Sequence, residues 1–343
     1  MALASQNTRI ADPIWVPLLT HYQGGGGNVV VDSARMAAHI RAIQPSVKQF
    51  LLAGSTGDGW EIGLDQFLEI VRLTRRADVF GDCRLLFGAL RPTTGEVVAW
   101  AQALERNLAE EGRPAGEYAG IAVCPPIDAD ANDDTILHHY ETIIGNTQSN
   151  IAVYQLPQIT GCRISPEAMR HLARHPRVTM FKDTSGEDTV AQAGGLGQVL
   201  LVRGAEGKYI ESLRPTGPYD GWLLSTGNVF GSLLRRMVAL HQAGHTRRAT
   251  QLSMVMAGLV DALFEAAQPV PFGNPFSNAN RAGDHLRAMG RNWRDAPPPL
   301  TASGNRLPLE LLAAAEDILG HLPGVPEHGY LTGSRPPHPG AEA

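Results

Sequence analysis

Residues 178–183 read Val-Thr-Met-Phe-Lys-Asp, a short apolar stretch that ends in a lysine. Several runs of this kind are continuously apolar, which is typical of parallel strands covered on both faces. Segments with a 3.6-residue period lie between the runs, and eight alternations of strand and helix favour an α/β fold, a (β/α)8 TIM barrel, over a doubly wound sheet. The eight runs are Ile14–Thr20, Gln49–Gly54, Arg84–Gly88, Gly120–Cys124, Ile151–Gln155, Val178–Lys182, Val199–Arg203 and Gly221–Ser225.

Four further helical patterns follow the eighth run and predict a C-terminal helical extension. We expect the barrel to span residues 1–230 and a helical layer packed on it to span residues 231–322. Residues 323–343 are rich in Pro and Gly without periodicity, so we expect a tail that wraps the surface or stays disordered. The four patterns are Ser232–Ala243, Arg247–Ala267, Asn278–Gly290 and Leu307–Leu319.

Composition excludes several classes of protein. The net charge of -5 argues against a nucleic-acid binder, which would carry a basic stripe. The N-terminal residues hold no apolar run, so neither a signal peptide nor a membrane span is expected. Cys83, Cys124 and Cys162 are far apart and odd in number. We therefore expect three reduced thiols in a cytoplasmic protein rather than a disulfide or a zinc site.

Lysine is rare in this chain. Of the 29 basic residues, three are lysines, namely Lys48, Lys182 and Lys208. A lysine whose pKa is lowered can act as an amine nucleophile, which arginine cannot. Lys48 and Lys208 lie outside the predicted strands, and we expect both to face solvent.

Lys182 ends the sixth predicted strand. Side chains alternate along a strand, so Val178, Met180 and Lys182 are expected to share one face. If that face points into the barrel, burial disfavours the ammonium form and lowers the pKa of Lys182 towards ~7–8. A lysine that reaches out to solvent, or that pairs with Asp183, is the alternative.

Two further motifs end predicted strands. Tyr154 closes the fifth strand, next to the sixth, where its phenol can transfer protons to and from a substrate held by Lys182. Packing alone would also explain a tyrosine there. The second strand ends in Gly54–Gly59, GSTGDG, whose small residues, hydroxyls and exposed N–H groups can cradle a carboxylate. An ordinary polar turn is the alternative.

Taken together, these motifs resemble the dihydrodipicolinate synthase/N-acetylneuraminate lyase superfamily. The matching motifs are GSTGD at Gly54–Asp58, YQLP at Tyr154–Pro157 and FKDTSGE at Phe181–Glu187. Their order and spacing also match, and the resemblance runs from about Val16 to about Trp293. It implies a (β/α)8 barrel with a C-terminal helical layer, usually tetrameric, that binds pyruvate or a related 2-oxo acid as an imine on lysine.

The resemblance also implies roles for single residues. Lys182 is the Schiff-base lysine, and Tyr154 is the tyrosine that transfers protons. Ser55 and Thr56 hold the carboxylate of the 2-oxo acid, with Gly57 behind them. The residues expected near the rest of the substrate are Gly204, Glu206 and Ser225.

The chain departs from the synthase branch at the substrate end of the site. The segment Val123–Asp128 lacks the tyrosine that serves a neighbouring subunit's proton relay in that branch. Ile159 stands where the branch has an arginine for the carboxylate of its aldehyde substrate. Asp58 replaces a usual Glu, and Trp60 replaces a usual small residue. The resemblance is therefore not to a typical dihydrodipicolinate synthase, and the acceptor pocket is expected to be unusual.

The predicted function is a cytoplasmic, lysine-dependent class I lyase or aldolase that cleaves or forms a carbon–carbon bond next to a 2-oxo acid. A sugar-acid dehydratase that uses the same imine, dihydrodipicolinate synthase itself and a non-catalytic 2-oxo acid binding protein are the alternatives. No cofactor is expected, and the expected assembly is a homo-oligomer, a tetramer or dimer.

Other motifs are set aside. Asp128–Asn132 imitates the start of a calcium loop, but Asp133 stands where that loop needs glycine. The Gly24–Gly27 run lacks a Walker lysine and is expected to be a flexible loop near the mouth of the site. His138 and His139 have no HExxH pattern and are expected at the surface, so no metal site is predicted.

Overall fold

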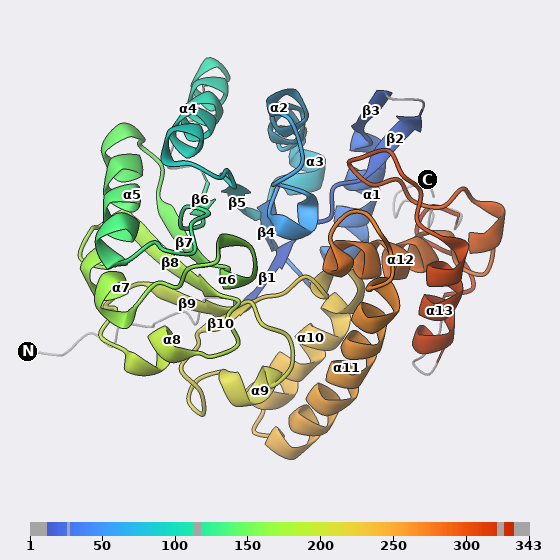
Figure 1. The fold of residues 1–343 in the computed structure, drawn as a ribbon. Helices are drawn as coiled ribbons and strands as arrows, with labels where there is room; N and C mark the ends of the chain where they lie inside the picture. The colour runs from blue at the N-terminus through green and yellow to red at the C-terminus, as the bar shows by residue number, and fades with distance from the viewer. Residues whose placement is uncertain (1–11, 26–27, 113–117, 321–325, 333–343) are drawn as a thin grey trace, which may run out of the picture.

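The computed structural model describes residues 12–25, 28–112, 118–320 and 326–332. Eight parallel strands close into a barrel in the order β1-β10-β9-β8-β7-β6-β5-β4 (Figure 1). The predicted TIM barrel is confirmed, and each of the eight predicted runs overlaps one strand. The strands are β1 (Ile14–Pro17), β4 (Gln49–Leu52), β5 (Arg84–Gly88), β6 (Gly120–Val123), β7 (Ile151–Gln155), β8 (Val178–Asp183), β9 (Leu200–Arg203) and β10 (Gly221–Leu223).

One pair of strands was not predicted. β2 (Tyr22–Gly25) and β3 (Asn28–Val31) form a separate antiparallel sheet. The expectation of a flexible loop is therefore wrong for Gly24 and Gly25, which lie in β2, whereas residues 26 and 27 lie outside the described residues. Backbone pairing overrides the weak strand propensity of glycine here, and Gly24 adopts a φ of 107° that other residues rarely accept.

Helices connect the strands and cover the outside of the barrel (Figure 1). The start of α4 shows how local sequence sets a boundary. The Thr93 hydroxyl accepts a hydrogen bond from the Glu96 N–H, and the Glu96 carboxylate accepts one from the Thr93 N–H, which is a capping box. The helices are α1 (Ser33–Ile43), α2 (Leu64–Leu73), α3 (Ala77–Phe80), α4 (Thr94–Glu110), α5 (Asp133–Asn146), α6 (Pro157–Thr160), α7 (Pro166–Leu172), α8 (Thr189–Ala193), α9 (Tyr209–Ser212) and α10 (Gly227–Gln242).

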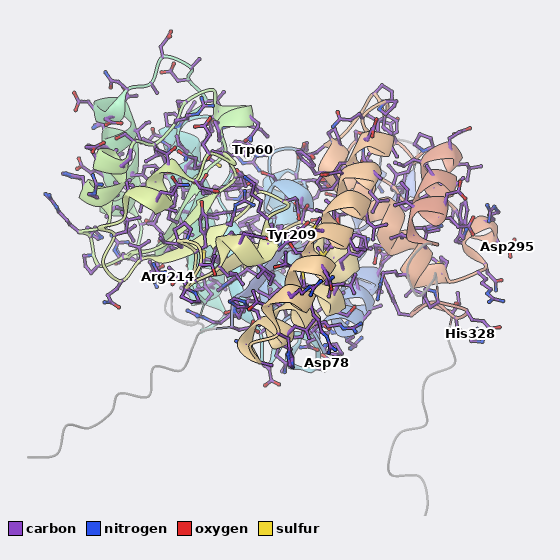
Figure 2. All side chains as sticks on the ribbon, turned by 90° about the horizontal axis from the view of Figure 1, so that it is seen from below. Trp60, Asp78, Tyr209, Arg214, Asp295 and His328 are labelled. Carbon is purple, nitrogen blue, oxygen red and sulfur yellow. The ribbon has the colours of Figure 1, made fainter. Side chains whose placement is uncertain are left out.

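Helices α11 (Thr246–Ala267), α12 (Pro275–Met289) and α13 (Leu309–Leu319) follow α10 and pack on one another. Figure 2 shows them to one side of the barrel, with Asp295 and His328 towards their far edge. In the tail, residues 326–332 lie against α12, because the Leu331 N–H donates to the Ala288 carbonyl at 2.9 Å. The remaining tail residues lie outside the described part of the chain.

The barrel interior is filled by one layer of apolar side chains, to which each strand contributes one residue. This layer excludes water from the space below the catalytic end of a TIM barrel, where the C-terminal ends of the strands meet. Two residues further along β7 and β8, on the same face, stand Tyr154 and Lys182. The layer consists of Trp15, Leu51, Leu86, Ala122, Ala152, Met180, Val202 and Leu223.

One detail of β8 differs from the prediction. Val178 does not share a face with Met180 and Lys182, because it packs in the larger apolar cluster outside the barrel. The pairing with β7 shifts by one residue between Val178 and Met180, so the alternation restarts there. The irregularity lies at the N-terminal end of the strand and leaves Lys182 pointing into the barrel.

Other expectations concern the surface. Among the described residues, no helix combines the length and apolar character needed to cross a lipid bilayer. Lys48 and Lys208 are exposed as expected, and Lys48 pairs with Asp82 at 3.3 Å. The expectation for His139 is wrong, because its ring is buried between the Thr94 hydroxyl and the Cys124 carbonyl.

Candidate active site

A cavity of about 350 Å³ opens at the C-terminal ends of the barrel strands. This is within the usual size range of small-molecule sites. Of the residues singled out from the sequence, the wall includes all but Gly57. The lining residues are Pro17, Ser55, Thr56, Tyr154, Leu156, Gln158, Ile159, Lys182, Thr184, Ser185, Gly186, Gly204, Ala205, Glu206, Leu223, Ser225, Phe264, Asn274 and Phe276.

Lys182 stands at the bottom of this cavity, with only 4% of its surface exposed. Burial lowers the pKa of its amine to about 7, because the low-dielectric interior disfavours the ammonium form. Asp183 does not pair with it and instead accepts hydrogen bonds from Ser185 at 2.6 Å and Tyr219 at 3.2 Å. At neutral pH a large fraction of the Lys182 amine is therefore unprotonated and nucleophilic.

Tyr154 lies directly beside the lysine. The two residues are register partners in β7 and β8, and the Lys182 Nζ is 3.8 Å from the centre of the Tyr154 ring. Burial raises the pKa of the Tyr154 phenol, so the group keeps its proton through the neutral range. Its hydroxyl is 3.5 Å from the Ser55 Oγ, which makes a short polar path from the lysine to the loop after β4.

Ser55 and Thr56 form the opposite side of the cavity floor. Both are buried, and they begin a 3₁₀ turn, Ser55–Gly57. Within the described chain no hydrogen bond uses the backbone N–H of either residue, so both can face an anion. Gly57 lies behind the turn, where its carbonyl accepts from the Thr20 hydroxyl at 2.7 Å and a Cβ would strike the Leu18 carbonyl.

Trp60 holds Ser55 in place. Its indole Nε1 donates a hydrogen bond of 3.0 Å to the Ser55 Oγ. Because an indole N–H can only donate, the Ser55 oxygen must accept, which leaves its own proton free for a ligand. The sequence marked Trp60 as unusual for the family but gave no indication of this contact.

Gly204 makes room for the lysine. A Cβ added at this position would lie 2.9 Å from the Lys182 Cε and would also strike the Thr184 methyl group. The Gly204 N–H donates to the Asp183 carbonyl at 2.6 Å. The residue therefore lets β8 and β9 approach closely at the site.

Glu206 lies on the wall next to Gly204. One carboxylate oxygen accepts from the Ser225 hydroxyl at 3.2 Å and the Thr226 N–H at 3.3 Å. The other accepts from the Tyr209 hydroxyl at 3.0 Å and the Thr226 hydroxyl at 2.8 Å. Desolvation raises the pKa of Glu206 despite these donors. Its negative charge favours a cation on Lys182.

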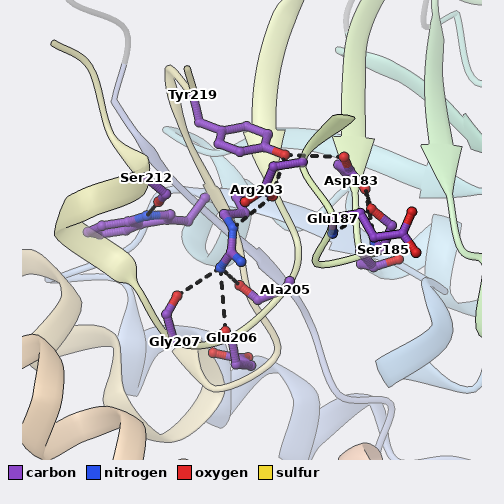
Figure 3. Close-up of polar contacts among 12 residues, drawn as sticks. Asp183, Ser185, Glu187, Arg203, Ala205, Glu206, Gly207, Ser212 and Tyr219 are labelled. Carbon is purple, nitrogen blue, oxygen red and sulfur yellow. Dashed lines mark hydrogen bonds and ion pairs between the residues drawn. The ribbon is translucent and has the colours of Figure 1, made fainter. Parts of the chain in front are cut away.

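Arg203 shapes the loop that carries Glu206 (Figure 3). Its Nη1 donates to the carbonyls of Ala205 at 2.6 Å and Gly207 at 2.8 Å, while its Nε pairs with Asp188 at 3.1 Å. The loop backbone is therefore held from behind by a buried guanidinium, and Glu206 keeps a fixed position over the cavity.

The loop after β4 is tied to the C-terminal helices. Asp58, in a left-handed conformation with φ 58°, accepts a hydrogen bond of 2.8 Å from the Tyr22 hydroxyl and forms a buried ion pair with Arg281 of α12. Arg281 also donates to the Thr20 carbonyl at 3.1 Å. A carboxylate at this position neutralises the buried cation.

The outer wall of the cavity is apolar and comes partly from the C-terminal helices. Phe264 of α11 and Phe276 of α12 meet edge to face, with ring centres 4.6 Å apart. Leu156 and Ile159 line the wall on the barrel side. The two phenylalanines could not be found from the sequence, because no strand-end motif marks them.

A second cluster of possible metal ligands lies outside the cavity. Ligand atoms of His21, His39 and Asp284 are within 4.8 Å of one another. They already form a hydrogen-bonded network, in which Arg35 and Tyr330 donate to Asp284 at 3.1 and 2.8 Å. The Arg35 cation opposes a metal ion at this place, so we assign no metal site to it.

A model of the dihydrodipicolinate synthetase family matches residues 13–276. The chain belongs to this family. One curated relative is the 4-hydroxy-tetrahydrodipicolinate synthase of Anaplasma marginale (strain Florida), 25% identical over 67% of this chain and 73% of the relative. Another is the enzyme of the same name from Archaeoglobus fulgidus, 24% identical over 70% of this chain and 80% of the relative.

Solved structures of the family share the fold. A prophage protein of the dihydrodipicolinic acid synthase family from E. coli K12, in complex with pyruvate, superposes with a TM-score of 0.71 at 18% identity, covering 90% of this chain and 97% of that one. N-acetylneuraminate lyase from Fusobacterium nucleatum gives 0.67 at 16% identity, with coverages of 90% and 97%. These structural similarities establish the fold, whereas the family assignment rests on the match to residues 13–276.

Proposed function

We propose that this protein is a lysine-dependent class I lyase or aldolase that binds a pyruvate-type 2-oxo acid as an imine on Lys182. The observation that carries the proposal is the buried Lys182 amine, whose pKa is about 7 and whose Nζ stands over the Tyr154 ring. No acidic residue in the described part of the chain forms a salt bridge with this amine, and such a buried amine has a clear chemical use as a nucleophile.

The first step follows from the arrangement at the floor. The neutral Lys182 amine attacks the ketone carbon, and the carbinolamine then loses its hydroxyl as water. The departing oxygen needs a proton, and the Tyr154 phenol, kept protonated by its raised pKa, is the acid within reach. The resulting iminium withdraws electrons from the bond next to it, so a carbon–carbon bond can break or form there.

The remaining groups hold the substrate in place and stabilise the charge that develops on it. The carboxylate of the 2-oxo acid is proposed to lie against the N–H groups and hydroxyls of Ser55 and Thr56, with Gly57 supporting the turn from behind. Glu206, fixed by its four donors, lies close enough to the iminium to stabilise its positive charge. Gly204 and Ser225 shape the wall on that side.

Two related reactions are weaker candidates. Dihydrodipicolinate synthase activity would bring a second carboxylate into the cavity, where Ile159 offers no cation. A sugar-acid dehydratase would use the same imine but needs hydrogen-bond partners for hydroxyl groups. The proposed cytoplasmic location rests on the three free thiols. The proposed homo-oligomer rests on the family resemblance.

Borohydride reduction in the presence of pyruvate tests the proposal. Reduction converts the imine to a stable secondary amine, so we expect an intact-mass increase for one pyruvate-derived group and a peptide map that places it on Lys182. The matched controls are borohydride alone and pyruvate alone. An unmodified chain, or an adduct on Lys48 or Lys208, would contradict the proposal.

A further inference from the structure

The cavity divides into two parts that differ in free hydrogen-bonding capacity. On the floor, the Lys182 amine, the proton of the Ser55 hydroxyl and the Thr56 hydroxyl are available to a ligand. These groups suit the ketone and carboxylate of a 2-oxo acid. Whatever is attached to the far end of that acid must lie against the outer wall, so the chemistry of this wall decides the tail of the substrate.

The outer wall offers apolar surface. Leu156, Ile159, Phe264 and Phe276 line it, and Phe276 is 45% exposed, which is unusual for a phenylalanine. The edge-to-face pair of Phe264 and Phe276 leaves ring surface turned towards the cavity. A flat apolar group placed there would cover these rings and gain both burial and aromatic contact.

The polar side chains of the outer wall are partly engaged in hydrogen bonds within the protein. The Gln158 amide donates to the Thr184 carbonyl at 2.9 Å. The Ser185 hydroxyl donates to Asp183 at 2.6 Å, and the Asn274 side-chain oxygen caps α12 by accepting from the N–H groups of the next turn. A tail with several hydroxyl groups would find few free partners on this wall and would lose its hydration without replacement.

Glu206 is the acid that a hydroxylated tail would be expected to use, yet it has no acceptor site left. A carboxylate has about four lone-pair positions, and Tyr209, Ser225 and Thr226 supply four donors to them. A substrate hydroxyl could bind only by displacing one of these donors, which would leave a buried group unpaired.

A charged tail is disfavoured for a separate reason. Among the described lining residues, Lys182 and Glu206 are the only charged ones. Lys182 lies on the floor, and Glu206 is itself an acid. A carboxylate or phosphate on the tail would meet Ile159 and the phenylalanines, so it would be desolvated without a counter-ion.

We propose that the second component handled by this enzyme is an apolar aldehyde of aromatic size. The inference rests on the proposed function and specifies its substrate class. In the cleavage direction, a 4-aryl-4-hydroxy-2-oxobutanoate bound as the iminium loses the proton of its 4-hydroxyl to the Tyr154 phenolate that imine formation leaves behind. The C3–C4 bond breaks, the aryl aldehyde leaves, and the electron pair of that bond forms the enamine of pyruvate. Protonation of the enamine and hydrolysis then release pyruvate, so no oxidant or other reactant is needed.

The test is condensation of pyruvate with benzaldehyde or with glyceraldehyde at equal enzyme concentration, with products quantified by mass spectrometry. We expect kcat/KM for benzaldehyde to exceed that for glyceraldehyde by about 10-fold or more, the usual scale of discrimination by an apolar pocket. Phe276→Ala and Phe264→Ala should each lower the benzaldehyde value by about 10-fold and change the glyceraldehyde value by less than about 3-fold.

The matched control is Met254→Ala, which removes apolar surface from α11 at a position 70% exposed and outside the cavity wall. It should change neither substrate. Equal or better turnover of glyceraldehyde, or equal losses for both aldehydes in the phenylalanine variants, would overturn the inference. Borohydride trapping of pyruvate distinguishes failure of the proposed function from failure of this inference. If no adduct forms on Lys182, the proposed function is wrong. If the adduct forms but the enzyme prefers polar aldehydes, only the inference about the substrate class is wrong.

Discussion

The floor and the mouth of the cavity are built from different parts of the chain and by different rules. The floor consists of strand ends and the loop after β4, where Lys182, Tyr154 and Ser55 are buried and held by strand register and hydrogen bonds. The mouth is the part bounded by the outer wall. It includes residues of α11 and α12, where Phe264 and Phe276 are more exposed and held by packing. A change in the floor should affect every substrate alike, whereas a change in the mouth should affect only the choice of tail.

The strongest test of the floor is Lys182→Met, which keeps the apolar stem and removes the amine. Catalysis should fall by about 10⁵-fold or more, as expected for loss of a covalent nucleophile. Turnover of benzaldehyde and glyceraldehyde with pyruvate should be lost equally. Retention of more than about 1% of the wild-type kcat/KM would mean that another group performs the chemistry.

The same variant should be more stable than the wild type. The amine of Lys182 has a pKa of about 7 in the folded chain and about 10.4 when unfolded. The unfolded state therefore binds more protons between these values, and stability rises with pH across this window. The gain in unfolding free energy for Lys182→Met should be on the order of a few kcal/mol at pH 7 and should vanish near pH ~10.4. Urea unfolding of both proteins at several pH values measures it.

Tyr154→Phe is the next largest expected effect. The ring that packs beside Lys182 remains, but the hydroxyl is lost. Turnover should fall by roughly 10²–10⁴, the usual contribution of a positioned acid–base group, again equally for both aldehydes. The thermal midpoint should change little. Activity within a few-fold of wild type would show that Tyr154 only packs in the floor.

The pH profile gives a smaller and graded effect. Only the neutral amine attacks the ketone, so kcat/KM for imine formation should rise about 10-fold per pH unit below pH 7 and level off above it. The raised pKa of Tyr154 predicts no second decline from this phenol up to about pH 10. Stopped-flow or quenched trapping with pyruvate measures the profile. A flat response between pH 6 and 8 would contradict the assigned pKa of Lys182.

Trp60→Phe should have the smallest effect, and it tests whether Trp60 acts in the floor or in the mouth. It removes the donor to Ser55 but keeps an aromatic ring. KM for pyruvate should rise by about 3–10-fold, the loss expected for one hydrogen bond, while kcat changes less. Trp100→Phe is the matched control, because the buried Trp100 Nε1 has no hydrogen-bond partner among the described residues. If the variant instead changes the preference between the two aldehydes and leaves the KM for pyruvate unchanged, Trp60 contributes to the mouth rather than to the floor.

The same division explains how much the sequence could predict. Strand ends carry residues whose neighbours are fixed by register, so Lys182 and Tyr154 could be placed together from their strands alone. The eight apolar runs likewise predicted the barrel. The strand pair β2–β3 was missed because Gly24 and Gly25 give a poor strand pattern.

The mouth could not be predicted for a different physical reason. Phe264 and Phe276 lie on amphipathic helices, and their position over the cavity depends on how α11 and α12 pack against the barrel. No local motif records that packing. Trp60 stood out as an unusual residue, but its hydrogen bond to Ser55 depends on the turn between them. The candidate catalytic residues could therefore be predicted from the strand sequences, whereas the candidate specificity residues depend on how the helices pack.

The buried pair between Asp58 and Arg281 has a consequence for how this protein can diversify. Asp58 belongs to the loop that begins with Ser55, and Arg281 lies about 1.4 turns along α12 from Phe276. Grafting onto this barrel a helix that lacks a basic residue at the Arg281 position would leave Asp58 as an isolated buried charge, which costs several kcal/mol. The loop after β4 and helix α12 are thus coupled through this pair, and a chimaera with a breakpoint between them should fold only if it keeps an acid at position 58 and a base at position 281.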